Sequence, residues 1–568
     1  MASKDNWSSS MGVILAVAGS AVGLGNFLKF PGQVAIHGGA AFMIAYVLSF
    51  ILVGLPFAMM EWTVGRKIGS AYHSVPWTFY AFFRRPSAKF VAAISIVIPF
   101  VICSYYTYIE AWCLGYAANF AFGSLNFENT QQAAEFFGNF VGISENGAAL
   151  GFSLKKVTIY FIIVFAINFG LIYLGISKGI EKFCKVAMPL LILLALILCV
   201  RVVTLSPRDT GRSDASISQG MGFMWNPTKV VLEEFNGGKW HEVKRLVGEN
   251  QIRETKLEMQ SAPSKFQNFR IREISLWMQL LNPSIWIAAV GQLFFSMSVG
   301  MGIIISYASY LKKKDDVVLS ALTSASANEF CEVCLGGMIT VPAAVAFMGL
   351  SGVVGACASL FDLGFNVLPL VFLKMPAGEL FGFMFFILLF LAAVTSSISI
   401  LQPSLAFFEE VLDISRNKAV VLLAVLMFFT SIFSMYYSKG LVALDTLDFW
   451  VGQTLIFIVA TYEIIMFSWV YGAEKLVKDA NGYSILKLPK SYSKIWRYYS
   501  PIILVTVFVA WFAKDVLGLF GGKLSYQITN LTTDINPVAV ASVGLIIALA
   551  IIFGIMIFTS KSFKEEKL

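Results

Sequence analysis

A short glycine-containing phrase occurs twice in the sequence, each time inside a strongly apolar stretch. The two copies are Val22–Gly25 and Val299–Gly302. Glycine is a poor helix former and lets backbone groups leave helical hydrogen bonding. Inside a membrane, such freed N–H and C=O groups are tolerated only where they face a cavity or a ligand. Two matching breaks in the two halves of a chain therefore predict a binding site between them.

Ionisable side chains also occur within the apolar stretches, where they are functional by default. They are Lys29, Glu61, Glu110, Glu332, Asp448 and Glu463. We interpret Glu61, Glu110 and Glu463 as buried structural or network carboxylates rather than ligands of a substrate.

Metal and enzymatic chemistry are not favoured. Cys331 and Cys334 have the spacing of a redox or metal pair, but no second pair or histidine lies nearby. The alternative interpretation, two small packing residues, is preferred. The histidines are His37, His73 and His241, none at the centre of a span. We find no phosphate-binding loop and no nucleophile elbow, so an enzyme is not expected.

The elements that must position these residues are membrane helices. The chain has 568 residues, of which 57% are hydrophobic and 13% charged, whereas a soluble domain carries about 25% charged residues. The net charge of +8 does not indicate nucleic acid, because the basic residues cluster in short loops. About twelve runs are long enough to span a bilayer. They lie near 11–36, 41–65, 90–122, 157–175, 184–204, 284–311, 317–346, 379–408, 418–437, 449–472, 498–519 and 537–559.

Basic loops alternate with the spans and predict the orientation. Lysines and arginines concentrate at 66–89, 178–185, 312–314 and 475–497. All of these loops lie on one side of the membrane if both termini are cytoplasmic, as the positive-inside rule requires.

Two segments interrupt the pattern of spans. Residues 347–376 are too broken to span, and we interpret them as an external cap over the entrance. Residues 205–282 form a long polar external segment, in which the alternation at Leu257/Met259 and Phe269/Ile271 suggests a small, partly β subdomain. A disordered loop is the alternative. The predicted divisions are 1–204, 205–282, 283–472 and 473–568.

Several long motifs resemble the neurotransmitter:sodium symporter family, bacterial amino-acid branch. The resemblance covers nearly the whole chain except the external insertion. The motifs are Gly19–Pro31, His37–Phe42, Tyr105–Glu110, Gly175–Glu181, Trp286–Tyr310, Asn328-Glu329, Thr395–Ser397 and Asp448–Trp450. The resemblance implies an all-α polytopic membrane protein. Its core consists of two inverted repeats of five helices, with the first and sixth helices broken and two further helices at the C-terminus.

The resemblance also implies two sodium sites built from oxygen ligands. The first would use the Ala21 carbonyl, Asn26, Ser296, Asn328 and the substrate carboxylate; most relatives carry threonine at the position of Ser296. The second would use the carbonyls of Gly19, Val22 and Ala392 with the hydroxyls of Thr395 and Ser396. Taken singly, each of these polar residues could instead serve helix–helix hydrogen bonding.

The residues between the broken helices imply a neutral amino acid as substrate. Gly23 stands where amine-transporting relatives carry aspartate, so the substrate is expected to bring its own carboxylate. Gly25 N–H and the Tyr106 hydroxyl would hold that carboxylate, while the carbonyls of Ala21 and Phe295, with Ser298, would receive the ammonium. Burying a charged side chain in the apolar remainder of the pocket would be costly. That remainder consists of Ile102, Tyr106, Phe295, Met301, Ser397 and Ile400. Met301 replaces an aromatic residue of the relatives, which predicts tolerance of several large neutral side chains.

Charged residues at matching positions predict chloride independence and two gates. Glu332 stands where chloride-dependent relatives carry serine, and its carboxylate would supply the charge of the anion. Lys29 and Asp448 match an external gate pair; Lys4 and Glu410 match a cytoplasmic pair. For Lys4 and Glu410 the alternative is ordinary solvated charge beside the membrane.

The leading functional hypothesis is a sodium-coupled symporter that imports neutral, mainly hydrophobic amino acids by alternating access. Its expected ion is sodium, its expected partners are a small neutral amino acid and the lipid bilayer, and its expected location is a prokaryotic inner membrane. An external cysteine pair typical of animal relatives is missing between the third and fourth spans. A sensor or a channel-like protein on the same fold, without coupled flux, is the alternative. The exact substrate, the sodium stoichiometry and the oligomeric state are left open.

Overall fold

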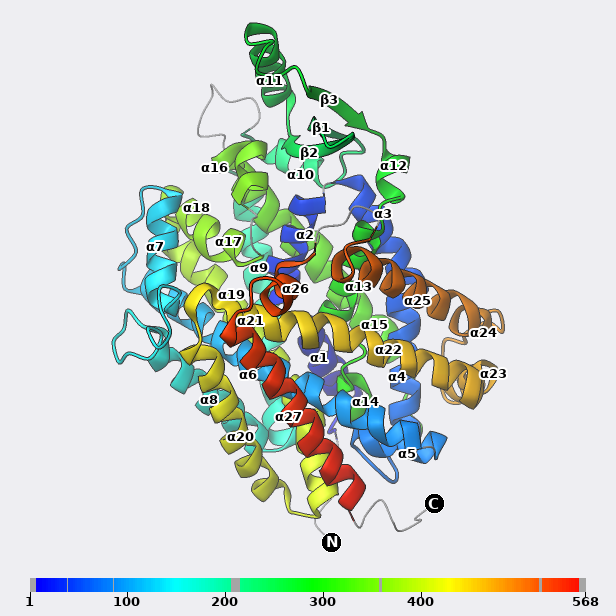
Figure 1. Cartoon of the computed structure of the whole chain (residues 1–568). Coiled ribbons are helices and arrows are strands. Elements are labelled where there is room, and N and C mark those ends of the chain that lie inside the picture. The colour runs from blue at the N-terminus through cyan, green and yellow to red at the C-terminus, as the bar shows by residue number, and fades with distance from the viewer. Residues whose placement is uncertain are drawn as a thin grey trace.

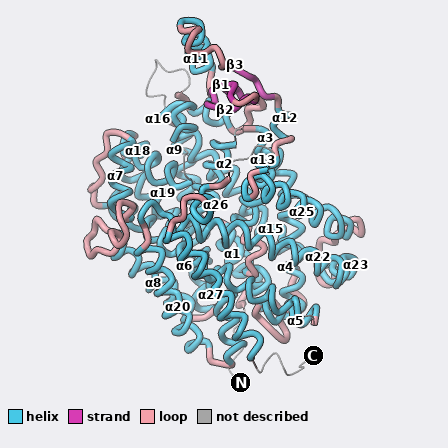
Figure 2. The backbone as a smooth tube through the Cα atoms, in the orientation of Figure 1, coloured by secondary structure: helices cyan, strands magenta, loops and turns pink. Residues whose placement is uncertain are grey.

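The computed structural model describes residues 7–37, 39–84, 86–205, 215–356, 360–519 and 524–560. A bundle of long helices carries a small three-stranded sheet at one end, and the last helix runs toward the opposite end (Figures 1 and 2). Within the described residues, nine helices are long and apolar enough to cross a membrane, or ten if the bent pair Met11–Ala21 and Gly25–His37 is one span. The fourth and sixth predicted spans contain the shorter apolar helices Val157–Tyr173 and Pro283–Ser296. The predicted fold class is confirmed.

The first half of the bundle contains the first five spans and two short helices outside them. Its helices are α1 (Ser10–Ala21), α2 (Phe30–His37), α3 (Ala40–Ser49), α4 (Leu55–Ile68), α5 (Val75–Phe83), α6 (Pro86–Ala121), α7 (Thr130–Val141), α8 (Val157–Tyr173) and α9 (Lys182–Val203).

The second half begins with a broken span and ends with the two C-terminal spans. Its helices up to the ninth span are α13 (Pro283–Ser296), α14 (Ile303–Ser309), α15 (Val317–Glu329), α16 (Met338–Ala356), α17 (Leu360–Asp362), α18 (Leu368–Lys374), α19 (Gly378–Leu412) and α20 (Arg416–Tyr436). The remaining helices are α21 (Val442–Leu447), α22 (Ile456–Ile465), α23 (Ala473–Asn481), α24 (Tyr492–Lys494), α25 (Ser500–Trp511), α26 (Tyr526–Thr532) and α27 (Pro537–Thr559).

Both glycine phrases break their helices as predicted. The first span bends by 44° between α1 and the segment Gly25–His37. In the sixth span the chain leaves the helix after Ser296 and resumes at Ile303. Ser298, Gly300 and Gly302 all have positive φ there, at 56°, 74° and 72°. That conformation costs glycine little, which explains why the second phrase needs its two glycines.

Several functional candidates sit on π-helical turns, which are common at functional sites. Asn26 and Lys29 lie on the turn Gly25–Lys29, Glu332 on Phe330–Gly337, and Asp448 on Asp448–Leu455.

In the segment that the sequence analysis interpreted as external, residues 215–282 fold into a defined subdomain instead of a disordered loop. Its elements are α10 (Ile217–Phe223), β1 (Lys229–Asn236), β2 (Lys239–Leu246), α11 (Glu249–Ser261), β3 (Phe269–Ile274) and α12 (Leu276–Leu280). The strands are antiparallel in the order β2-β1-β3. Phe269 and Ile271 lie on β3 as predicted, but the prediction was wrong for Leu257 and Met259, which lie on α11.

The cysteine pair lies in a helix without metal partners. Cys331 is buried and Cys334 is exposed, and within the described residues no cluster of three histidine, cysteine or carboxylate side chains could hold a metal.

Candidate functional site

A small cavity lies where the two broken spans meet α6 and α19. Its volume is about 20 Å³, close to the space that one water molecule needs. Every predicted substrate residue except Ser397 lines it. The lining consists of Ser20, Ala21, Gly23, Gly25, Ile102, Tyr106, Phe295, Ser296, Ser298, Met301, Ser396 and Ile400.

Ser397 is turned away from this cavity and Ser396 takes its place. The Ser397 hydroxyl donates to Asn168 Oδ1 at 2.9 Å, and the Asn168 amide donates to Glu110 Oε2 at 2.9 Å. All three residues are buried. This chain of hydrogen bonds fixes the rotation of α19 against α6 and α8. It also agrees with the interpretation of Glu110 as a network carboxylate.

The first break offers hydrogen-bond donors to an anion. Gly25 opens the helical segment that continues into α2, and the first N–H groups of a helical segment have no partner within it. Tyr106 accepts a hydrogen bond from Leu24 N–H at 3.4 Å, which leaves its own proton available to an acceptor. A β-carbon on Gly23 would lie 2.7 Å from Ser396 Oγ and 3.2 Å from the Tyr106 hydroxyl. The absence of a side chain there keeps the cavity open beside Tyr106.

The second break is held by polar contacts on two sides. Ser298 Oγ donates to the Ser20 carbonyl at 2.9 Å, which ties the two broken spans together. Gly300 N–H donates to Glu61 at 3.3 Å. Glu61 is fully buried on α4, so it supports the unwound backbone from behind and does not line the cavity.

The predicted first sodium residues are gathered in one hydrogen-bonded cluster. Asn26 Oδ1 accepts from Gly23 N–H at 2.8 Å, and the Asn26 amide donates to Asn328 Oδ1 at 2.8 Å. Asn328 in turn donates to Ser296 Oγ at 3.4 Å. The cluster therefore brings three side-chain oxygens together beside the first break, which suits a hard cation.

Glu332 completes this cluster and is fully buried. Its carboxylate accepts hydrogen bonds from Gln292 at 2.6 Å, from Asn26 at 3.2 Å and from Asn328 at 3.3 Å. All of these donors are neutral, and no ion pair joins Glu332 to any residue in the described ranges. A buried carboxylate is costly unless a cation offsets its charge. A cation bound among Asn26, Ser296 and Asn328 would provide that charge.

The predicted second sodium residues also meet across two helices. Ser396 Oγ donates to the carbonyls of Gly19 and Ser20 at 3.4 and 3.2 Å. Thr395 Oγ1 donates to the Ala392 carbonyl at 3.0 Å. The Thr395 side chain packs closely against Gly19, because a β-carbon added to Gly19 would lie 3.2 Å from Thr395 Cβ. Hydroxyls on α19 therefore face the carbonyl end of α1, where Val22 ends the helix.

A larger cavity of about 330 Å³, called the outer cavity below, adjoins the central one and extends along α2. Tyr106 and Phe295 line both cavities, so these two rings separate them. Lys29 and Asp448 line the outer cavity, but among the described residues no ion pair joins them. Lys29 Nζ instead lies 4.1 Å from the centre of the Phe295 ring.

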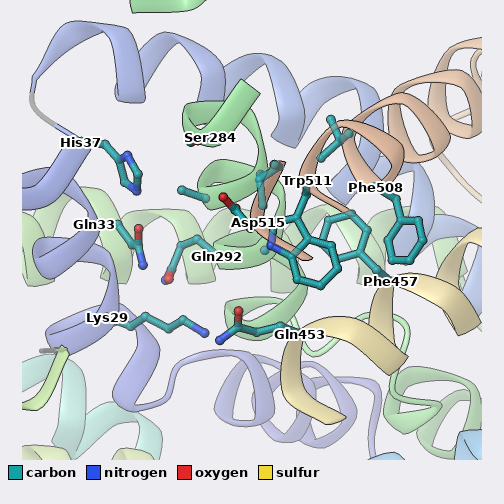
Figure 3. A pocket seen from close by; sticks show the side chains of 14 residues that line it. Lys29, Gln33, His37, Ser284, Gln292, Gln453, Phe457, Phe508, Trp511 and Asp515 are labelled. Atoms are coloured by element: carbon teal, nitrogen blue, oxygen red, sulfur yellow. The ribbon is translucent and has the colours of Figure 1, made fainter. Parts of the chain in front are cut away.

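Gln453 contacts Asp448 and lines the outer cavity together with both charged residues. It donates to Asp448 Oδ2 at 3.1 Å, and Figure 3 shows the Lys29 side chain extending toward its amide. Tyr105 donates to the other Asp448 oxygen at 2.8 Å. The sequence analysis did not place Gln453 or Asn168 near the site, and only their three-dimensional contacts reveal them.

Aromatic packing joins the residues that precede α1 to α14. Trp7 donates to the Tyr307 carbonyl at 3.1 Å, and the two rings meet edge to face with centres 5.2 Å apart. The Tyr307 hydroxyl donates to Ser399 at 2.9 Å. Glu410 accepts from the backbone of His73 and from Ser74, at the start of α5. Lys4, its predicted partner, lies outside the described residues.

The sequence profile of the sodium:neurotransmitter symporter family matches residues 4–139 and 269–565. The chain is 29% identical over 569 residues to an uncharacterised sodium-dependent transporter of Methanocaldococcus jannaschii, with 99% of each chain covered. It is 24% identical over 538 residues to the sodium-dependent serotonin transporter of Drosophila melanogaster, covering 89% of this chain and 76% of the relative.

A solved structure has the same fold. The crystal structure of MhsT in complex with L-phenylalanine superposes with a TM-score of 0.69 at 25% identity, covering 89% of this chain and 99% of MhsT.

Proposed function

The chain belongs to the sodium:neurotransmitter symporter family, and we propose that it imports neutral, mainly hydrophobic amino acids together with sodium and without chloride. The family is one of transporters, and this protein is a multi-pass membrane protein of that kind. We further propose a prokaryotic inner membrane with both termini cytoplasmic, because the basic loops then lie inside.

The observation that carries the proposal is the chemistry around the central cavity. Gly25 N–H and the Tyr106 hydroxyl provide donors for a carboxylate, and the segment Gly25–His37 adds the positive end of a helix dipole. The C-terminal end of α13, beside Ser296, is the negative end of a helix dipole and therefore attracts an ammonium. The remaining wall is apolar, with Ile102, Met301 and Ile400. A zwitterion with an apolar side chain fits this arrangement.

Coupling to sodium rests on the two oxygen clusters. The first contains Asn26, Ser296 and Asn328 beside the carboxylate-binding break, so the substrate carboxylate would complete the shell of that ion. The second contains Thr395 and Ser396 against the carbonyl end of α1. Ions at these places would stabilise the conformation in which both broken spans are joined to α15 and α19.

The difference between the two sides of the central cavity supports transport by alternating access. The outer cavity reaches down to Phe295 and Tyr106, whereas Trp7 and Tyr307 pack below the centre. Transport would require the outer cavity to close and this aromatic packing to open. A sensor or channel-like protein would need only one of these movements.

Counterflow in proteoliposomes separates these possibilities. Vesicles loaded with unlabelled leucine or phenylalanine should accumulate labelled substrate only when sodium is present on both sides. Exchange without sodium, or binding without exchange, would contradict the proposal. A competition panel of glutamate, lysine, a monoamine and the neutral amino acids tests the substrate class; preference for any of the first three would also contradict it.

Met301 should set the range of side chains that the site accepts. It is 2% exposed and lines the apolar wall. Met301→Phe adds bulk and rigidity, so apparent affinity for large substrates should fall on the order of tenfold relative to alanine and valine. Uptake competition measures this ratio. Met556→Phe on α27 makes the same change away from the cavity and should leave the ratio unaltered.

Ser396 and Ser397 should have different effects although they are neighbours. Ser396→Ala removes a proposed sodium ligand, so the half-saturating sodium concentration should rise on the order of tenfold. Ser397→Ala should leave the sodium requirement and the substrate affinity unchanged and lower the melting temperature, because Asn168 loses a buried partner. Sodium titrations of uptake and thermal unfolding measure both. Larger loss of substrate affinity in Ser397→Ala than in Ser396→Ala would contradict this assignment.

A further inference from the structure

The external subdomain, defined as residues 215–282, rests on the outer ends of the broken spans. It lies at the end of the bundle that carries α2, α3 and α13 (Figure 1), and the strands form its centre (Figure 2). The matched ranges of the family profile leave residues 140–268 out, so the family as a whole does not explain the strands β1 and β2.

Arg245 connects the subdomain to the outer half of the first span. From β2 it donates to the carbonyls of Ala35 and Ile36 at 3.2 and 3.4 Å. These carbonyls belong to the last turn of α2, which has no helical donors for them. A cation at that position also interacts favourably with the helix dipole. The guanidinium lies 5.3 Å from the centre of the Phe223 ring, so its direction is fixed.

Burial does not neutralise this cation. Desolvation lowers the pKa of Arg245 to about 10, and Glu242 acts in the opposite direction. Arg245 therefore remains protonated at neutral pH.

The loop 223–227, which follows α10, contacts the connection between the first two spans. Ala40 N–H, at the start of α3, donates to the Asn226 carbonyl at 3.0 Å. Gly39 has a φ of 68°, and a β-carbon there would lie 2.3 Å from Asn226 O. The connection after α2 is therefore packed directly against the backbone at Asn226, leaving no space for a side chain.

A second contact joins this loop to the outer half of the sixth span. Buried Gln279 on α12 donates to the carbonyls of Pro227 and Ile274, both at 3.0 Å. Trp286 on α13 donates to the Leu280 carbonyl at 2.8 Å. The path from α2 to α13 thus runs through Arg245, the loop 223–227, Gln279 and α12.

We propose that Arg245 is a positioning residue of the outer gate, which couples α2 to α13 so that the two outer half-helices move as one body. Lys29 lies on the helical segment that leads into α2, and Phe295 lies on α13. The Lys29 ammonium contacts the Phe295 ring above the central cavity. Keeping them in register preserves that contact while the gate closes on α6 and the segment Asp448–Leu455. The inference rests on the proposed transport cycle, because only then do the half-helices need to move together.

The test measures distances between spin labels in the full-length protein, in nanodiscs and in a background without native cysteines. Labels at exposed Ile36, Leu281 and Phe122 report on α2, on the connection that leads from α12 directly into α13, and on the residue that follows α6. In the wild type, the distribution of Ile36–Leu281 distances should stay narrow with and without sodium and leucine. Both labels should move relative to the label at Phe122.

In Arg245→Gln, the population with α2 separated from α13 should rise about tenfold, the ratio expected from losing hydrogen bonds to a charged group. Arg245→Lys keeps the cation and should restore most of the coupling. Arg253→Gln, on exposed α11, removes the same charge from the same subdomain and is the matched control.

Identical Ile36–Leu281 distributions in Arg245→Gln and Arg253→Gln would overturn the inference. If Arg245→Gln does not fold, Gln279→Leu breaks the path at its other end and should broaden the same distribution; an unchanged distribution would overturn the inference as well. The Ile36–Leu281 distributions of the variants can be compared without sodium and leucine, and that comparison tests the coupling without requiring transport. A wild type whose Ile36–Phe122 distance ignores sodium and leucine would instead contradict the proposed function.

Discussion

Glu332→Ser should make transport depend on chloride. The carboxylate is fully buried and accepts hydrogen bonds from Gln292, Asn26 and Asn328, beside the proposed first sodium site. Two opposite unit charges about 4 Å apart attract each other by about 4 kcal/mol at an effective dielectric of about 20. Allowing for relaxation and solvent entry, uptake in chloride-free buffer should fall at least about 100-fold. Chloride should restore it, because the anion would occupy the space and replace the charge.

Labelled amino-acid uptake in proteoliposomes with chloride or gluconate as the anion measures this effect. The wild type should transport equally in both anions. Glu128→Ser makes the same replacement at an exposed position just before α7 and should resemble the wild type. Equal uptake by Glu332→Ser in chloride and gluconate would show that Glu332 does not substitute for an anion.

Asn26→Ala should abolish tight sodium binding. One side chain holds three partners: it accepts from Gly23 N–H and donates to Asn328 and Glu332. Its loss removes a sodium ligand and leaves buried polar groups without partners, each at a cost of about 1–3 kcal/mol. The half-saturating sodium concentration should therefore rise on the order of 100-fold.

Sodium titration of substrate binding to detergent-purified protein measures the constant without requiring flux. Asn139→Ala, at an exposed position of α7, is the matched control because it also removes an asparagine amide. Since sodium and substrate share this site in the proposal, substrate affinity at fixed sodium should decline in parallel. A normal sodium titration in Asn26→Ala would exclude Asn26 as a ligand.

The spans and their breaks could be read directly from the sequence. A long apolar run can satisfy its backbone in a membrane only as a helix, so the positions of α6, α19 and α27 follow from composition. The two glycine phrases likewise predicted where the helices stop. In the second phrase, positive φ at Gly300 and Gly302 excludes a continuous helix.

The direction of individual side chains could not be read in the same way. Ser396 and Ser397 differ by one position, which is a rotation of about 100° on a helix. Which of them lines the cavity depends on Asn168, which is 229 positions away from Ser397. The sequence also could not give the contacts of the predicted gate residues Lys29 and Asp448. In the structure Lys29 contacts Phe295, and Asp448 accepts a hydrogen bond from Gln453.

The external subdomain shows most clearly which features the sequence predicts and which depend on the tertiary structure. Alternation predicted strand structure correctly at Phe269 and Ile271 but wrongly at Leu257 and Met259, since a short polar helix can carry the same spacing by chance. Nothing in the local pattern indicates that Arg245 reaches the end of α2. The sequence by itself determined which segments cross the membrane, where they break and which chemical groups lie near the breaks, because these depend on local backbone and solvation energies. The tertiary structure decided which groups meet, because hydrogen bonds and ion contacts depend on distances between residues that lie hundreds of positions apart.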